Sequence, residues 1–314
     1  MDNIVEIENL SKDYEVGFWK KRKVRALDDL SLAVKPGQIF GFLGGNGAGK
    51  TTTIKILMTL LFPTSGTARI LGTDVSDVSM HRRIGYCPEN PYFYDYLTAN
   101  ELMNYFGELF GYGAAERTRK TAELLTQVGI DERDRNKQLR KFSKGMLQRV
   151  GIAQSLINDP EIVFFDEPMS GLDPIGRREV RELIAGLPSH GATVFMSTHI
   201  LSDVEALCDE VAILRRGRLS ATGKLDDLLA KQGDVQLYEI RLRNISADKL
   251  PAGLDHVSNP GGVTVQVDDE AEIERIISAA RSAGGKLISV QEVKQSLEEL
   301  FVDSTVDKGD SSAP

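Results

Sequence analysis

The chain has 314 residues and a formal net charge of −8, with 46 Asp and Glu against 38 Lys and Arg. This length allows about two domains, and the 41% of hydrophobic residues are enough for a sizeable core. The acidic balance argues against binding to nucleic acid through bulk basic charge, and we expect no specific nucleic-acid partner.

The cysteines and the hydropathy of the sequence indicate the cellular compartment in which the protein works. The two cysteines, Cys87 and Cys208, lie far apart and in no metal-ligand spacing, which favours a reduced cytosolic setting. The N-terminus has no basic stretch and no long apolar core, so we expect no signal peptide. No run approaches the roughly 18 apolar residues of a membrane span, so a membrane role requires another chain.

The first predicted elements are two strands at residues 3–10 and 30–35. Between them, residues 17–25 combine aromatic and basic side chains. One interpretation is a solvated hairpin tip, because charge runs usually face water. The other is contact with anionic lipid headgroups, which replacement of the basic residues 20–23 by Gln or Ser would test on anionic vesicles.

Residues 44–51, Gly-Gly-Asn-Gly-Ala-Gly-Lys-Thr, fit the phosphate-binding pattern G-x-x-x-x-G-K-[ST]. The apolar run 39–43 before them predicts a buried strand, and apolar residues at helical spacing predict a helix over 52–61. The four fixed positions should match by chance in roughly one chain of this length in a hundred. The strand–loop–helix context makes chance rarer still, so we interpret the segment as a phosphate-binding loop.

Each residue type in this loop suits a triphosphate. Glycines let the backbone curl so that successive N–H groups point inward. The start of the following helix adds partial positive charge. Lys50 can place its ammonium on the β and γ oxygens, and the Thr51 hydroxyl can ligate Mg²⁺.

The middle of the chain is predicted to be rich in helix. Residues 82–97 include a loop with many Pro and aromatic residues, and apolar residues recur at helical spacing over 97–157. Within this part, Ser143 and Gly145 stand at the start of an apolar helix. A Ser and a Gly at a helix start can bind an anion, although any capped helix start looks similar.

Two strand ends downstream carry further polar residues. An apolar strand at 161–167 ends in Asp166, which can hold Mg²⁺, and Glu167, which can orient and deprotonate an attacking water. The alternative is a strand end with acidic capping residues, which the upstream phosphate loop disfavours. A second buried strand at 192–197 leads to His199, which can hydrogen-bond a γ-phosphate oxygen, although a lone His is usually structural.

The last third of the chain shows a different order of elements. Residues 210–222 predict a hairpin, and residues 223–233 predict a helix followed by a linker. The further predicted elements are strands at 235–242, 263–267 and 286–293 and helices at 273–283 and 296–301. These elements form a small α+β domain.

Together these motifs resemble the ATP-binding subunit of ATP-binding-cassette (ABC) transporters over residues 3–225. Residues 44–51 correspond to the family's Walker A motif, with Gly45 where the family often has Pro. Residues 162–166 correspond to Walker B. Residues 142–146, Phe-Ser-Lys-Gly-Met, are similar to the Leu-Ser-Gly-Gly-Gln signature, and Ser170 to Asp173 match the D-loop.

The resemblance implies roles for individual residues. The expected catalytic residues are Glu167, His199 and Lys50. The expected Mg²⁺ ligands are Thr51, Asp166 and Glu89. The expected nucleotide-binding residues are Tyr14, at the adenine-stacking position, and Gly44, Asn46, Gly47, Ala48, Gly49, Lys50, Thr51, Thr52, Ser143, Gly145 and Asp173.

Glu89 departs from the family pattern, which has Gln at this position. A carboxylate can approach Mg²⁺ but adds a negative charge near the γ-phosphate. Unchanged Mg²⁺ dependence of the ATPase in a Glu89→Gln variant would argue that Glu89 is not a ligand.

The resemblance implies an α/β fold, a P-loop NTPase cassette with a RecA-like core, a helical subdomain at about 97–157 and an antiparallel β subdomain. We expect the ATP-binding domain at 1–225 and a linker at 226–234. A small C-terminal α+β accessory domain should follow at 235–303, and the polar residues 304–314 should be a disordered tail.

The end of the chain carries a second resemblance. Leu287 to Val290 followed by Ser296 to Phe301 is similar to the ending of bacterial ATPase subunits of ABC-2-type systems, which are mostly exporters. In those systems a small C-terminal domain follows the cassette. The resemblance therefore implies an exporter-like ATPase.

In this family each ATP lies between the Walker A motif of one subunit and the signature of the other. The resemblance therefore implies a homodimer, or a pair with a close paralogue, around two ATP and Mg²⁺. The loop near residues 89–96 should receive the cytoplasmic helix of an integral-membrane permease, of ABC-2 type. The protein is then expected in the cytoplasm, peripheral on the inner face of the cell membrane.

Three other classes are alternatives. A soluble cassette ATPase acting on nucleic acid or the ribosome is disfavoured by the lack of a long heptad insertion and of a second cassette. A non-hydrolysing regulatory module is disfavoured by Glu167 and His199, and a GTPase by residues 136–139, Asn-Lys-Gln-Leu, which lack the acid of N-K-x-D. Copurification with an integral membrane protein, and the ATPase activity of a Glu167→Gln variant, would discriminate between the classes.

Overall fold

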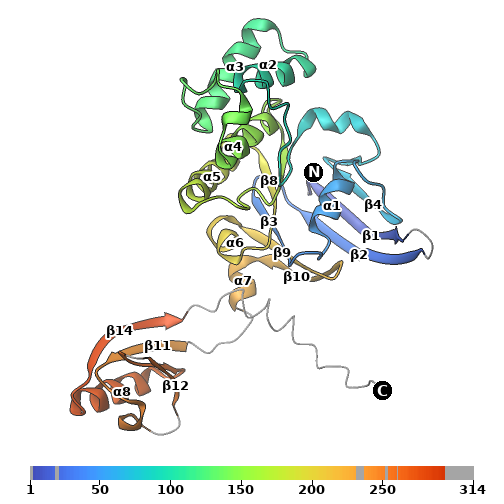
Figure 1. The fold of residues 1–314 in the computed structure, drawn as a ribbon. Coiled ribbons are helices and arrows are strands. Elements are labelled where there is room, and N and C mark those ends of the chain that lie inside the picture. The colour runs from blue at the N-terminus through green and yellow to red at the C-terminus, as the bar shows by residue number, and fades with distance from the viewer. Residues whose placement is uncertain (1–2, 18–20, 231–236, 252–253, 260, 294–314) are drawn as a thin grey trace. The chain divides into compact units, whose positions relative to one another are not determined.

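Two units make up the chain, Met1–Leu225 and Asp226–Pro314. The structure is a computed structural model, and it describes residues 3–17, 21–230, 237–251, 254–259 and 261–293. Figure 1 shows the order of the elements along the chain.

A six-stranded sheet forms the core of the first unit. Its strands, in spatial order, are β10 (Arg218–Lys224), β9 (Glu210–Arg215), β3 (Ile39–Leu43), β8 (Thr193–Thr198), β7 (Ile162–Asp166) and β6 (Ile84–Cys87). All neighbours pair in parallel except β10, which is antiparallel to β9. Every residue of β3, β7 and β8 is buried, as expected for short apolar strands in a sheet covered on both faces.

The parallel arrangement positions the functional segments. Because β3, β7 and β8 run in the same direction, their carboxyl ends lie at one edge of the sheet. The loop at 44–49 follows β3, Glu167 follows β7 and His199 follows β8. In open α/β sheets, ligands bind at the carboxyl ends of the strands, so this edge is where a site is expected.

A second, antiparallel sheet lies beside the core sheet in Figure 1. Its strands, in spatial order, are β2 (Arg22–Val34), β1 (Val5–Val16), β4 (Ser65–Ile70) and β5 (Thr73–Asp74). The β1–β2 hairpin is longer than the predicted strands at 3–10 and 30–35, because pairing continues to Val16 opposite Arg22. The Arg25 guanidinium supports this extension through hydrogen bonds of 2.8 and 3.2 Å to the cross-strand carboxylate of Asp13.

Helices cover the core sheet and extend from it. They are α1 (Lys50–Leu57), α2 (Ala99–Leu109), α3 (Ala114–Gln127), α4 (Lys144–Ser155), α5 (Pro174–Gly186) and α6 (Leu201–Leu207). The next helix, α7 (Leu225–Ala230), begins at the last residue of the first unit. Short 3₁₀ segments lie at Val78–Arg83, Leu139–Lys141, Pro188–His190 and, in the second unit, Ala247–Lys249. In Figure 1, α2 and α3 project away from the two sheets.

The second unit is a small α+β structure, as expected from the sequence. Its antiparallel sheet contains, in spatial order, β12 (Asp255–Asn259), β13 (Gly262–Val267), β11 (Leu237–Arg243) and β14 (Lys286–Val293), and its helix is α8 (Glu270–Ser282). Alternate residues of β11 and β13 pack with Ile276 and Ala280 of α8 in a core of its own. The sequence did not predict β12.

Two local predictions are wrong. Residues 84–87 were expected within a loop, but they form the parallel edge strand β6. Gly85 permits this, because a Cβ there would lie 2.0 Å from the Ser155 carbonyl oxygen. The helix expected over 52–61 ends at Leu57, because Thr59 adopts a left-handed φ of 57° and its hydroxyl donates to the Val75 carbonyl.

Several predictions fall partly or wholly outside the described residues. These are the tip of the basic and aromatic segment at 18–20, the linker at 231–234, the short helix at 296–301 and the tail at 304–314. The first part of the expected linker, up to Ala230, belongs to α7. Within the part of the chain that the structure describes, the helices are too short or too polar to cross a bilayer.

Candidate nucleotide-binding site

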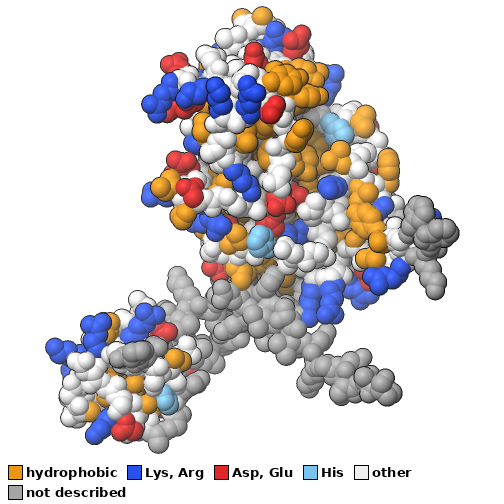
Figure 2. Space-filling view, in the orientation of Figure 1, with side chains coloured by type: hydrophobic (Ala, Val, Ile, Leu, Met, Phe, Trp, Pro, Cys, Tyr) orange, Lys and Arg blue, Asp and Glu red, His pale blue; other side chains and the backbone are white. Residues whose placement is uncertain are grey.

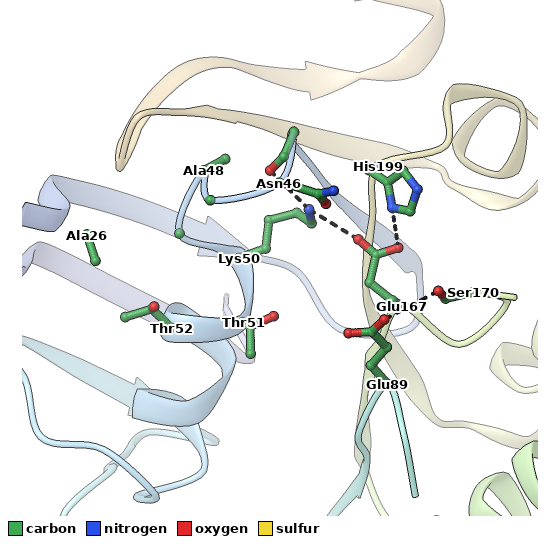
Figure 3. Close-up of a pocket in the computed structure, with 13 residues that line it drawn as sticks. Ala26, Asn46, Ala48, Lys50, Thr51, Thr52, Glu89, Glu167, Ser170 and His199 are labelled. Carbon is green, nitrogen blue, oxygen red and sulfur yellow. Dashed lines mark hydrogen bonds and ion pairs between the residues drawn. The ribbon is translucent and has the colours of Figure 1, made fainter.

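A cavity of about 380 Å³ lies at the carboxyl ends of β3, β7 and β8. Its lining residues are Ala26, Gly45, Asn46, Gly47, Ala48, Gly49, Lys50, Thr51, Thr52, Glu89, Glu167, Ser170 and His199. Figure 3 shows these side chains converging on the loop that connects β3 to α1. Most of the predicted phosphate-binding residues are thus placed around one pocket.

Glycine is required at the tightest point of the loop. Gly49 precedes α1 with a φ of 112°, and a Cβ there would lie 2.7 Å from the Ala26 carbonyl oxygen. Gly47 also adopts a left-handed φ, of 79°. The loop therefore runs directly into the N-terminus of α1. Backbone N–H groups at such a position suit the binding of an anion.

Lys50 lies deep in the pocket, with only 6% of its surface exposed. Its ammonium donates to the Gly44 carbonyl oxygen at 2.6 Å, and its Nζ lies 3.1 Å from Oε1 of Glu167. Gly44 does not line the cavity itself but holds this lysine through its carbonyl. The buried ammonium is thereby fixed beside the position where the loop would hold phosphate.

Glu167 bridges Lys50 and His199, as the dashed lines in Figure 3 show. Its Oε2 lies 2.8 Å from Nδ1 of His199. Its backbone has a left-handed φ of 50°, which is uncommon for a residue other than glycine, and its N–H donates to the Ser197 carbonyl and hydroxyl oxygens, both at 3.1 Å. A strained backbone that a neighbouring strand holds in place is typical of a functional site.

Asp166 lies just behind the pocket wall. Its Oδ1 accepts hydrogen bonds from the Ser197 hydroxyl at 2.6 Å and from the Thr51 hydroxyl at 3.2 Å. Burial is the main cause that raises the pKa of this carboxyl, and the charges of Glu167 and Glu89 add to it, whereas the two hydrogen bonds act in the opposite direction.

These oxygens fit Mg²⁺. The hydroxyl of Thr51 and the carboxylate of Asp166 are both oxygen donors, which Mg²⁺ prefers, and they already lie within 3.2 Å of each other. A cation here would favour the charged form of the buried carboxylate. Glu89, the third predicted ligand, lines the pocket and accepts a hydrogen bond from the Ser170 hydroxyl at 3.3 Å.

Besides Gly44, four predicted nucleotide-binding residues do not line this cavity. Tyr14 lies next to it, with its hydroxyl 3.4 Å from Oγ1 of Thr52. Ser143, Gly145 and Asp173 are not part of it either. Ser143 caps α4 by accepting from the Met146 N–H, and Asp173 caps α5 by accepting from the Gly176 N–H.

Three lining residues were missing from the predicted set, namely Gly45, Ser170 and Ala26, and Gly45 was noted only as part of the Walker A motif. Ser170 belongs to the turn after β7, which the sequence analysis matched to the D-loop without giving this side chain a role. Ala26 lies on β2, where no local pattern marks it. Only the pairing of β2 with β1, and its contact with the loop at Gly49, brings Ala26 to the pocket.

Comparison with known proteins identifies the family. A relative from Synechocystis sp., an uncharacterized ABC transporter ATP-binding protein, is 44% identical over 98% of this chain and 86% of its own length. The chain belongs to the ABC transporter ATP-binding proteins. The ABC transporter family model matches residues 27–170, and the model of the DrrA1-3-like ATP-binding protein C-terminal domain matches residues 223–305.

This ABC protein is also similar to a further named relative and to a solved structure. The daunorubicin/doxorubicin resistance ATP-binding protein DrrA of Streptomyces peucetius is 33% identical over 88% of this chain and 87% of its own length. The ATP-binding cassette MJ0796, solved as a dimer in a post-hydrolysis state with ADP and phosphate, superimposes with a TM-score of 0.65 at 27% identity. That match covers 70% of this chain and 98% of the cassette.

The predicted fold class and the resemblance to exporter-like ABC ATPases are therefore confirmed. The protein is an ATP-binding subunit of ABC transporters and an ATPase.

Proposed function

We propose that two copies of this chain close around two ATP and Mg²⁺, and that hydrolysis in this dimer drives export by a separate membrane permease. The observation that carries the proposal is the arrangement of Lys50, Glu167 and His199 at the phosphate-binding loop. This arrangement combines a cation for the phosphates with a carboxylate held beside them.

Hydrolysis needs a positioned base and a cation at the phosphates. We assign the base to Glu167, whose carboxylate orients a water and takes its proton. His199 holds that carboxylate by donating from Nδ1 to Oε2, and a ring that carries a proton on both nitrogens can also donate to a γ-phosphate oxygen. Lys50 and the loop N–H groups hold the β and γ oxygens.

Mg²⁺ would be held by Thr51, Asp166 and Glu89. When bound, this cation neutralises charge on the β and γ oxygens during phosphoryl transfer.

The dimer is supported by residues that lie away from the chain's own pocket. Ser143, Gly145 and Asp173 carry the signature and D-loop motifs but do not line the cavity. Ser143 and Gly145 are exposed or partly exposed at the start of α4, where they can meet a facing copy. The relative MJ0796 was solved as a dimer. A close paralogue could replace the second copy.

The loop between β6 and α2 supports docking of a permease. Tyr92, Tyr94 and Tyr96 on this loop are 94%, 59% and 59% exposed. Figure 2 shows that hydrophobic side chains also gather on the adjacent surface over α2, where Tyr105 and Leu109 are exposed. Aromatic side chains are enriched at protein interfaces, so this surface suits a helix from a membrane partner.

The same loop is joined to the signature segment by backbone hydrogen bonds. The N–H groups of Leu139 and Arg140 donate to the carbonyl oxygens of Leu97 and Asp95 at 2.8 and 3.0 Å. Ser143 follows only three residues later. A permease helix that moves the tyrosine loop would therefore move the signature, which couples transport to the nucleotide state.

The proposals of export and of a location at the membrane are based on similarity to named relatives. DrrA is a drug resistance ATP-binding protein, and this chain matches it and its C-terminal domain family. We therefore assign an ABC-2-type permease as partner and the inner face of the cell membrane as the location. The C-terminal domain at 235–303 is proposed as an accessory domain, after a linker that begins with α7.

The dimer is tested by the concentration dependence of the ATPase. The rate per subunit should rise with protein concentration, because each site needs a second copy. A Ser143→Arg variant should lose most hydrolysis yet retain ADP binding, since Ser143 lies outside its own pocket. Ser220→Arg, at an exposed position on β10, is the matched control. A rate independent of concentration, with Ser143 dispensable, would overturn the dimer.

The permease is tested by copurification from membranes. The wild type should copurify with an integral membrane protein. Replacing Tyr94 and Tyr96 by Ser should reduce this association, whereas Tyr112→Ser, away from the loop, should not. Equal recovery of the membrane protein with both variants would contradict docking at this loop.

A further inference from the structure

The side chains of Lys12 and Tyr14 lie next to each other on β1. Residues two apart in a strand share a face, so both point to the same side of the sheet. The Lys12 Nζ lies over the Tyr14 ring, 5.4 Å from its centroid, which is within the range of a cation–π interaction. Among the described residues, no other cation or aromatic ring stacks on Tyr14.

Both members of this pair are anchored to the segment that forms the pocket. The Lys12 ammonium donates to the Phe62 carbonyl oxygen at 2.7 Å, in the segment after α1. The Tyr14 hydroxyl lies 3.4 Å from Oγ1 of Thr52, which is on α1 and lines the cavity. The ring is therefore held at its hydroxyl by one helix and on one face by a lysine that is itself fixed.

The surroundings of the ring suit a flat apolar group. Tyr14 pairs directly with Val24 across the hairpin, and Val24 and Val16 are 37% and 55% exposed. Ala26, two residues beyond Val24 and at a shift in the β1–β2 register, lines the cavity. Lys12 lies over one face of the Tyr14 ring, so a base that stacks on this ring would take the opposite face.

We propose that Lys12 is a positioning residue for the nucleotide base, acting through the Tyr14 ring. The inference rests on the proposed function, in which Tyr14 stacks on adenine. The Lys12 ammonium restricts the ring to one orientation before the nucleotide arrives. A side chain that is already ordered loses less entropy on binding, so the base binds more tightly. Lys12 touches neither the phosphates nor the base.

The test compares a ligand that has a base with one that lacks it. Binding of ADP and of inorganic pyrophosphate, each with Mg²⁺, is measured by calorimetry on the full chain. Lys12→Met keeps the apolar stem and removes the charge. It should raise the Kd for ADP about twofold to fivefold, the strength of an exposed cation–π contact, and leave the Kd for pyrophosphate unchanged. Lys12→Arg should restore ADP binding.

A double-mutant cycle separates this role from a merely structural one. In a Tyr14→Leu background, Lys12→Met should have no further effect on ADP binding, because the ring through which it acts is gone. Lys35→Met, which removes another exposed lysine of the same sheet region, is the matched control. If Lys12→Met weakens ADP binding only because the Lys12–Phe62 hydrogen bond is lost, the same weakening should also appear in the Tyr14→Leu background. That outcome overturns the inference.

The remaining outcomes distinguish the role of Lys12 from its premise, which is that Tyr14 stacks on adenine. If Tyr14→Leu itself leaves ADP binding unchanged, stacking on Tyr14 is wrong and the role of Lys12 falls with it. If Tyr14→Leu weakens ADP binding but Lys12→Met does not, only the role of Lys12 is overturned. Equal weakening of ADP and pyrophosphate by Lys12→Met also overturns it, because the effect is then not on the base.

Discussion

The Ser170 hydroxyl donates a hydrogen bond to the Glu89 carboxylate, with 3.3 Å between Oγ and Oε1. The bond joins the loop after β6 to the turn after β7, and both side chains line the nucleotide pocket. The charge of Glu89 also contributes to the raised pKa of Asp166. Glu89 is therefore held where its carboxylate acts on the proposed Mg²⁺ site.

Glu89→Gln tests whether this carboxylate holds the cation. A neutral amide attracts a dication less strongly, so the Mg²⁺ concentration for half-maximal ATPase should rise by about tenfold. Direct binding of Mn²⁺ in the presence of ADP gives a second readout. Ser170→Ala is the matched control, because it removes the hydrogen bond and leaves the charge. An unchanged Mg²⁺ dependence would show that Glu89 is not a ligand.

Glu167→Gln tests the proposed base. The amide keeps the size of the side chain but cannot take a proton, so ATPase activity should fall by about a hundredfold to ten-thousandfold. ATP binding should remain, and the ATP-bound dimer should accumulate on a sizing column. Glu161→Gln, which alters an exposed carboxylate paired with Arg83, should retain activity. A Glu167→Gln variant as active as the wild type would contradict the mechanism.

Much of the fold could be predicted because the core strands are short apolar runs with strong local signals. The runs at 39–43, 161–167 and 192–197 correspond to β3, β7 and β8. The strand β6 was missed because its four residues include Gly85 and are followed by Pro88. Its place depends on a close approach to the Ser155 backbone, which is a tertiary contact with no local signature.

The site was predictable where its residues belong to one continuous motif. Residues 45–51 line the pocket because the loop is a local structure. Ala26 could not be found in this way, since it reaches the pocket only through the packing of β2 against Gly49. The sequence also cannot show that Glu167 is held by Lys50 and His199, because that arrangement depends on the order of three strands.

Asp166→Asn should stabilise the protein at neutral pH in the absence of nucleotide and metal. The pKa of Asp166 is raised mainly by burial, so the folded state binds this proton more tightly than the unfolded state does. Its contribution to the free energy of unfolding therefore falls as the pH rises through the interval between the unfolded pKa and the raised folded pKa. Above that interval, the ionised carboxylate is a net cost.

The comparison is made as a difference in Tm across pH in EDTA. Asn at position 166 can still accept from Ser197 and Thr51, so the packing is retained. The advantage of the variant should be largest at neutral pH and should shrink in acid, where Asp166 is protonated in both states. ATPase activity should be lost because the proposed ligand is gone. A variant that is less stable at neutral pH, or an advantage that grows in acid, would contradict this assignment.

Arg181 of α5 forms an ion pair with Asp203 of α6. Removing this pair by mutation should lower the stability of the first unit. Asp203 is fully buried, and its Oδ1 accepts from the Arg181 Nη2 at 2.8 Å. Its Oδ2 has no partner among the described residues. Arg181→Met would leave the buried carboxylate unpaired, which costs about 3 kcal/mol. This corresponds to a Tm lower by about 6–12 °C for a unit of this size.

Two further variants isolate the cause of that loss. Asp203→Asn combined with Arg181→Met should recover part of it, because no charge is then left buried without a partner. Arg178→Met breaks an exposed pair with Glu182 on the same helix and should change the Tm little, since exposed ion pairs contribute little. Equal shifts in Arg181→Met and Arg178→Met would mean that the buried position of Asp203 does not govern the stability of this contact.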